Sequence, residues 1–198
     1  DMEVSLESER GEEVADIDFT VAGSAADIIS NASDLSGASG VIVADATGAS
    51  SVDAVDGAAL SELESQLGEN VEFRIEDSAG AIAAELSSDN TLLDGADDLV
   101  VDGGDTTVAG ASDIQGVAAY DASGSAYTIT DSASAILGDT GSVIDEGVTE
   151  INVDGPVGAG VGVQLGSLED SVTEAGFTAD VQFGVMDDAG AIAAELSS

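Results

Sequence analysis

Apolar and polar residues alternate over short stretches of the chain and then change to helical spacing, and this succession occurs four times. The four blocks align without gaps and are FTVAGSAADII (19–29), FRIEDSAGAIA (73–83), YTITDSASAIL (127–137) and FGVMDDAGAIA (183–193). Each block opens on an aromatic residue: Phe19, Phe73, Tyr127 or Phe183. These openings are spaced 54, 54 and 56 residues apart. The alternation that follows predicts a short strand with one buried face.

The second half of each block predicts a short helix. Apolar residues follow the i, i+3, i+4 spacing of one helix face, as at Ala79, Ile82 and Ala83. The central position of this stripe is always isoleucine: Ile28, Ile82, Ile136 and Ile192. An aspartate precedes the helix in three copies, where an N-cap would accept hydrogen bonds from free N–H groups of the first turn. These aspartates are Asp77, Asp131 and Asp187, and Gly23 stands in the first copy.

A second strand and a second helical stretch are predicted between the blocks. The strands are the runs VIVAD (41–45), LVVDG (99–103) and INVDG (151–155), which end in Gly and Asp as strands do before turns. The clearest second helix is DGAALSELESQLG (56–68), whereas the matching segments near 108–120 and 161–175 contain more glycine. The predicted unit is strand, short helix, strand, and then a variable helix or loop.

This repeat predicts an α/β fold, an elongated solenoid of parallel strands and short Ala-rich helices with about 54 residues per repeat. One unit has too few large side chains to bury its own faces, whereas stacked units bury them against one another. The predicted boundaries are a partial repeat tail at 1–18, repeats at 19–72, 73–126 and 127–182, and a partial repeat head at 183–198. Two tandem compact domains are the alternative architecture.

The two ends of the sequence predict stacking. LESERGEEV (6–14) is similar to LESQLGENV (63–71), and AGAIAAELSS occurs unchanged at 79–88 and 189–198. Neither end shows the polar capping unit that a stand-alone solenoid needs. The expected partner is therefore the chain itself, in a head-to-tail homopolymer, or adjoining repeats of a longer chain.

A large negative charge narrows the range of partners. The chain has 41 acidic and 2 basic residues, giving a net charge of −39. This charge excludes a nucleic-acid-binding face and opposes docking on anionic lipid. No apolar run approaches the roughly 18–20 residues that membrane insertion requires. Repulsion among the carboxylates needs screening, and both halophilic adaptation and calcium loading fit the composition.

The acidic segment at 94–105 is the candidate metal site. Oxygen-rich, flexible segments beside glycines suit Ca²⁺. The candidate ligands are Asp94, Asp97, Asp98, Asp102 and Asp105. No EF-hand pattern is present, and a solvated acidic loop is the alternative interpretation. No other cofactor is predicted.

The residue types argue against an enzyme. The chain contains no His and no Cys, which removes the usual general base and any thiol nucleophile. The glycine-rich run GPVGAGVG (155–162) does not match the dinucleotide-binding fingerprint. We therefore expect no enzymatic activity and no catalytic residues.

The blocks FRIEDSAGAIAAEL and YTITDSASAIL resemble the V-x-D-T-A-A-N-I repeats of large secreted bacterial surface and adhesin-like proteins. This chain has Ser78 and Ser132 where that family often has Thr, and it lacks the Asn before the Ile. The resemblance implies an extracellular or cell-surface structural role, as a filament, stalk or surface layer, without catalytic residues. The alternative function is an adhesin-type module that binds a glycan or a protein, with or without calcium.

Overall fold

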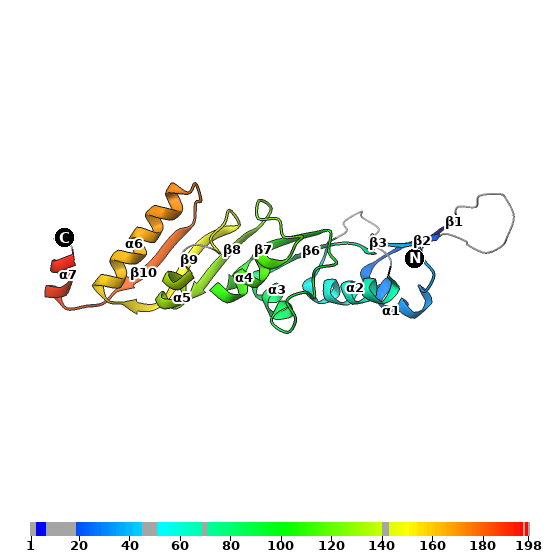
Figure 1. Ribbon diagram of the computed structural model, residues 1–198, viewed down its shortest axis with the longest axis horizontal. Coiled ribbons are helices and arrows are strands. Elements are labelled where there is room, and N and C mark those ends of the chain that lie inside the picture. Colours follow the sequence, from blue (N-terminus) through cyan, green and yellow to red (C-terminus); the bar gives the residue numbers. More distant parts are fainter. Residues whose placement is uncertain are drawn as a thin grey trace.

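The computed structural model describes residues 3–6, 19–44, 51–68, 71–139, 143–195 and 197. Strands and helices alternate along the chain, so the prediction of an α/β fold with parallel strands is confirmed. The sheets are open and do not close into a barrel. Figure 1 shows an elongated molecule, with the first strands at one end and the last helix at the other.

Neighbouring strands lie side by side along the molecule. One sheet has the order β1-β2-β3-β5 and the other β10-β9-β8-β7-β6-β4. Among the described strands every pairing is parallel except that of β1 with β2. The bounds are β1 (Glu3–Leu6), β2 (Phe19–Gly23), β3 (Gly40–Val43), β4 (Ser51–Val52), β5 (Val71–Glu72), β6 (Arg74–Asp77), β7 (Asp98–Thr106), β8 (Ala126–Asp131), β9 (Val148–Val157) and β10 (Asp180–Val185). The sheets adjoin because β5 and β6 are separated by one residue.

The helices form a layer beside the sheets, because each one contacts the next in chain order (Figure 1). The bounds are α1 (Ala25–Ser30), η1 (Ala32–Asp34, a 3-10 turn), α2 (Ala54–Leu67), α3 (Ala79–Leu86), α4 (Val108–Gly116), α5 (Ala133–Asp139), α6 (Ala159–Glu174) and α7 (Ala189–Glu195). The glycine-rich segments form α4 and α6, so both are helices rather than loops. A Cβ at Gly162 of α6 would lie 2.8 Å from Val185 Cγ2, so the close packing at this position favours glycine.

An aliphatic core lies between the helices and the sheets. The helical isoleucines Ile28, Ile82 and Ile136 are at most 3% exposed. The opening aromatics Phe73 and Tyr127 are 2% and 1% exposed. Their counterparts at the two ends, Phe19 and Phe183, are half-buried. One connected cluster of buried side chains runs from Val21 to Val181.

The aspartates that follow the opening strands do not cap their own helices, and that prediction is wrong. The N-cap of α3 is Ser78, because Asp77 still belongs to β6. Asp77 Oδ1 accepts a hydrogen bond from the Ser78 backbone N–H at 2.7 Å. Its Oδ2 accepts one from the backbone N–H of Ala54, the first residue of the preceding helix α2, at 3.1 Å. Asp77 therefore joins two consecutive strand–helix units.

The same bridge occurs twice more. Asp131 accepts from the N–H groups of Ser132 at 2.7 Å and of Val108, at the start of α4, at 3.1 Å. Asp187 accepts from Asp188 at 2.8 Å and from Ala159, at the start of α6, at 3.0 Å. These hydrogen bonds, that from Ala159 first, hold the pKa of Asp187 below its usual value. We call Asp77, Asp131 and Asp187 the bridging aspartates.

Asp131→Ala is expected to lower the free energy of unfolding by about 1–2 kcal/mol, as for the loss of a strong helix cap. The substitution removes the acceptor that joins β8 to the start of α4 and the acceptor of the Ser132 N–H. Asp154→Ala is the matched control, because Asp154 is exposed in β9 and the same charge is lost. Chemical denaturation at fixed salt compares the two. Equal effects of the two changes would contradict a bridging role.

Candidate functional site

The last copy of the motif exposes positions that earlier copies bury. β10 pairs with β9 on one side, and no described strand lies on its other side. Val185 is 45% exposed, whereas Ile75 and Ile129 at the same motif position are 0% and 1% exposed. The next residue, Met186, is 74% exposed, and Ile192 of α7 is half-buried. We call Val185, Met186 and Ile192 the C-terminal edge.

This edge is held in place by the same contacts as the interior units. The Met186 N–H donates to the Val157 carbonyl oxygen at 2.8 Å, which extends the pairing of β10 with β9. Asp187 fixes the following residues to the start of α6. The Asp188 carboxylate accepts a hydrogen bond from the Ala191 N–H at 2.9 Å in the first turn of α7. The C-terminal edge is therefore a formed strand–helix surface with its apolar side chains partly open.

The opposite edge has a different structure. β1 runs antiparallel to β2, with Glu3 opposite Ala22 and Leu6 opposite Phe19. Segments 6–14 and 63–71 are similar in sequence, but their first residues differ in local structure. Leu6 lies in the strand β1, whereas Leu63 lies in the helix α2. The rest of the predicted partial repeat, at 1–2 and 7–18, lies outside the described residues.

The five aspartates of the candidate calcium site are not brought together. Asp94 is exposed in the turn before β7, and Asp97 accepts a hydrogen bond from the Phe73 N–H at 3.0 Å. Asp98, Asp102 and Asp105 all lie along β7. An extended strand rises about 3.3 Å per residue, so Asp98 and Asp105 are roughly 20 Å apart. Across the described part of the chain, no group of three or more acidic residues is placed to hold a metal ion.

The reason is that β7 continues through the segment interpreted as a loop. Gly103 and Gly104 have positive φ angles of 79° and 80°, which only glycine adopts readily. The pairing of β7 with β8 shifts register between Asp102 and Asp105, so the two glycines form a bulge within the strand. Asp98, Asp102 and Asp105 are therefore spread along a strand instead of converging around a turn.

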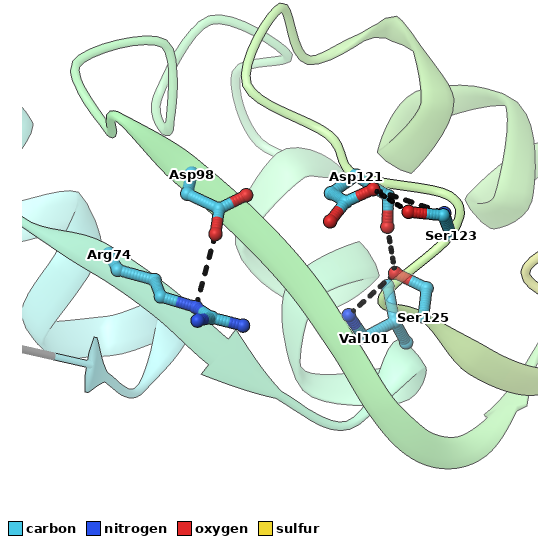
Figure 2. Close-up of polar contacts among 6 residues, drawn as sticks. All are labelled: Arg74, Asp98, Val101, Asp121, Ser123 and Ser125. Atoms are coloured by element: carbon cyan, nitrogen blue, oxygen red, sulfur yellow. Dashed lines mark hydrogen bonds and ion pairs between the residues drawn. The ribbon is translucent and has the colours of Figure 1, made fainter. Parts of the chain in front are cut away.

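Arg74 is the one basic residue in the described part of the chain, and it faces acidic groups from two segments. Its Nε lies 3.2 Å from Asp98 Oδ2. In Figure 2 the guanidinium also points toward the loop that contains Asp121. The Ser123 hydroxyl, which donates to Asp121 at 2.8 Å, is the main cause that holds the pKa of Asp121 below its usual value, and Arg74 adds to it.

The same loop completes the hydrogen bonding of β7. The Ser125 hydroxyl accepts from the Val101 N–H at 3.0 Å and donates to the Asp121 carbonyl oxygen at 2.7 Å (Figure 2). The Leu99 N–H donates to the Ala119 carbonyl oxygen at 2.8 Å. These contacts hold the loop against the strand, so the ion pair of Arg74 lies on a fixed surface.

An open groove of about 470 Å³ lies between α3 and α4. Small residues line it, including Gly80, Ala83, Ala84 and Gly110, because the two helices pack closely there. Its acidic lining residues are Asp105 and Asp113. The groove is shallow and lined largely by alanine and glycine.

Among the described residues, no helix is both long and apolar enough to cross a membrane. Neither a family model nor a curated protein matches the chain.

Proposed function

We propose that this chain is a non-enzymatic structural protein, an elongated α/β solenoid that extends by end-to-end stacking within a filament, stalk or surface layer. The main support for this proposal is the exposed C-terminal edge. Val185 is 45% exposed at a motif position that a neighbouring strand and helix otherwise bury, as at Ile75 and Ile129. A strand beside β10 would cover Val185 and Met186 as β7 covers one side of β6.

Adjoining repeats would supply a strand–helix unit of the same kind to this edge, whereas a second copy would supply its β1. In a head-to-tail contact, β10 of one copy would lie beside β1 of the next. Because β1 is antiparallel to the other strands, that junction would be an antiparallel pair. The outer side of an edge strand presents free backbone N–H and C=O groups, which supports pairing of this kind.

Two features support an extracellular or cell-surface setting. The blocks resemble the V-x-D-T-A-A-N-I repeats of secreted bacterial surface proteins. The net charge of −39 also favours surroundings rich in salt or calcium, where the carboxylates are screened.

Val185→Asp is expected to abolish assembly, because it places a carboxylate in the surface that stacking would bury. Val55→Asp is the matched control: Val55 in α2 is 62% exposed, lies within the array and receives the same charge. Sedimentation velocity in molar salt compares both variants with the unsubstituted chain, and circular dichroism verifies that both fold. Assembly of Val185→Asp to the same size as the unsubstituted chain would rule out stacking through this edge.

A further inference from the structure

One stretch of the sequence occurs twice in the chain, in two different environments. AGAIAAELSS stands at 79–88, where it forms α3, and at 189–198, where its first residues form α7. In the first copy Ala79 and Ile82 are both 0% exposed. Their counterparts in the second copy are exposed and half-buried, respectively. Because the two sequences are identical, the difference comes from the elements that lie beside α3 and not beside α7.

The elements that cover α3 are the strand β7 and the helix α4, which follow it in the chain. β7 approaches α3 closely, since a Cβ on Gly80 would lie 3.2 Å from the Asp105 carbonyl oxygen. α4 does the same, since a Cβ on Gly110 would lie 3.0 Å from the Ala83 Cβ. Small residues on α3 are therefore what lets the next strand and the next helix pack against it.

α7 keeps the small residues that this packing needs. Gly190 and Ala193 stand where α3 has Gly80 and Ala83, and both are exposed. Among the described residues, a Cβ on Gly190 would meet only Asp188 Oδ1 within 4 Å, at 3.1 Å, and Asp188 belongs to the turn before α7 itself. α7 thus presents the contact surface of α3, and no described part of the chain fills it.

The register of a strand that would cover β10 follows from three pairings inside the molecule. In each of them the strand that opens a block pairs in parallel with the second strand of the same unit. The third residue of the block lies opposite an aliphatic residue, and the fifth lies opposite a valine. The pairs are Val21 with Val41, Gly23 with Val43, Ile75 with Leu99, Asp77 with Val101, Ile129 with Ile151 and Asp131 with Val153. In the last block these two positions are Val185 and Asp187.

We propose that the C-terminal edge binds a parallel strand followed by a helix, of the type that 98–116 forms, with an aliphatic residue opposite Val185 and a valine opposite Asp187. This inference rests on the role of the edge in the proposed function and names its partner, a further unit of the same array. A parallel strand ends at the edge of the sheet where α7 begins, so the helix after it can return beside α7, as α4 does beside α3. An antiparallel strand such as β1 would cover β10 but would lead away from α7.

The repeated stretch provides the test. Residues 89–126 are appended after Ser198, which gives α7 the same continuation that α3 has. The chain has no cysteine, so Val185→Cys introduces a single thiol. Its rate of reaction with a thiol reagent is measured in molar KCl with and without the appended segment. The rate is expected to fall about tenfold or more on extension, because a buried thiol reacts only when the structure opens locally.

Ala193→Leu in the extended chain is expected to restore the fast reaction of the thiol at position 185. The larger side chain would occupy the space into which the next helix packs, as α4 packs on Ala83. Ala194→Leu is the matched control and is expected to leave the thiol protected, because Ala84, its counterpart in α3, stays exposed beside α4. Circular dichroism verifies that both variants fold.

Equal reaction rates with and without the appended segment would overturn the proposal. Protection that persists in Ala193→Leu would also overturn it, since the covering segment would then lie elsewhere. The outcome is separable from stacking between copies, which sedimentation of the chain without the appended segment measures. Assembly of that chain with an unprotected thiol in the extended chain would retain stacking and reject this partner. A protected thiol in the extended chain, with no assembly of the shorter one, would retain this partner and reject stacking.

Discussion

Ile82→Asp is expected to remove cooperative folding of the unit around α3. Ile82 is 0% exposed in the aliphatic core between the helix layer and the sheet. A carboxylate there must be buried without a partner or must draw α3 away from the sheet, and either costs about 4 kcal/mol or more. Because a domain is typically stable by about 5–15 kcal/mol, this is a large share of the total. Loss of the main thermal transition by circular dichroism is the expected result.

Ile42→Asp is the control, because Ile42 in β3 is 37% exposed and its new charge can remain in water. Its effect is expected to be small. Hydrogen exchange would locate the damage in Ile82→Asp, with protection lost first around 79–86. Unchanged melting of Ile82→Asp would show that the assigned register of the motif is wrong.

The melting temperature is expected to rise steeply with salt. The 41 acidic residues face 2 basic ones, and Arg74 pairs with Asp98 at the surface. The Debye length, beyond which salt screens the interaction of two exposed charges, falls from about 10 Å at 0.1 M salt to about 3 Å at 1 M. A gain of several kcal/mol would raise the melting temperature of a chain this size by roughly 10 °C. Thermal unfolding across a KCl series measures it, and a flat profile would contradict it.

Lowering the pH at low salt changes the stability of the fold in two ways: through the repulsion among all the carboxylates and through the contacts of individual carboxylates. Protonation lowers the net charge and so stabilises the fold. Glu64 acts in the same direction: its raised pKa gives stability that is complete below its unfolded pKa and lost as pH rises through the folded value. Asp187 acts oppositely, because its lowered pKa gives stability that is lost as pH falls through the folded value. Stability is therefore expected to rise on mild acidification and to fall in strong acid.

Local patterns were sufficient to predict the strands of the four blocks, the second strands between them and the short helices, but not β1, β4 and β5. The spacing of Phe73, Ile75 and Ile82 identifies a buried strand face and a buried helix stripe, because each depends only on nearby residues. The glycine-rich helices α4 and α6 were underestimated. Glycine lowers intrinsic helix propensity, but Gly162 packs directly against Val185, and this tertiary contact is invisible in local spacing.

Contacts between consecutive strand–helix units could not be predicted from the sequence. Asp77 was correctly predicted to lie beside the start of a helix. Its Oδ2 also accepts a hydrogen bond from the N–H of Ala54, 23 residues earlier, because β4 pairs with β6. The five clustered aspartates were predicted to share a loop, whereas Asp98, Asp102 and Asp105 lie along β7, which continues through a glycine bulge. Conversely, Glu64 and Gly95 are far apart in sequence and lie close together only because the segment before β7 folds against α2.

Particle mass and shape, by light scattering and negative-stain microscopy, test end-to-end stacking most directly. The chain would be compared in low salt, in molar salt and in millimolar calcium. We predict filaments in at least one screened condition, with a subunit spacing that matches the long axis of the molecule in Figure 1. A stable monomer in every condition would contradict the proposed assembly and favour a module that binds a glycan or protein.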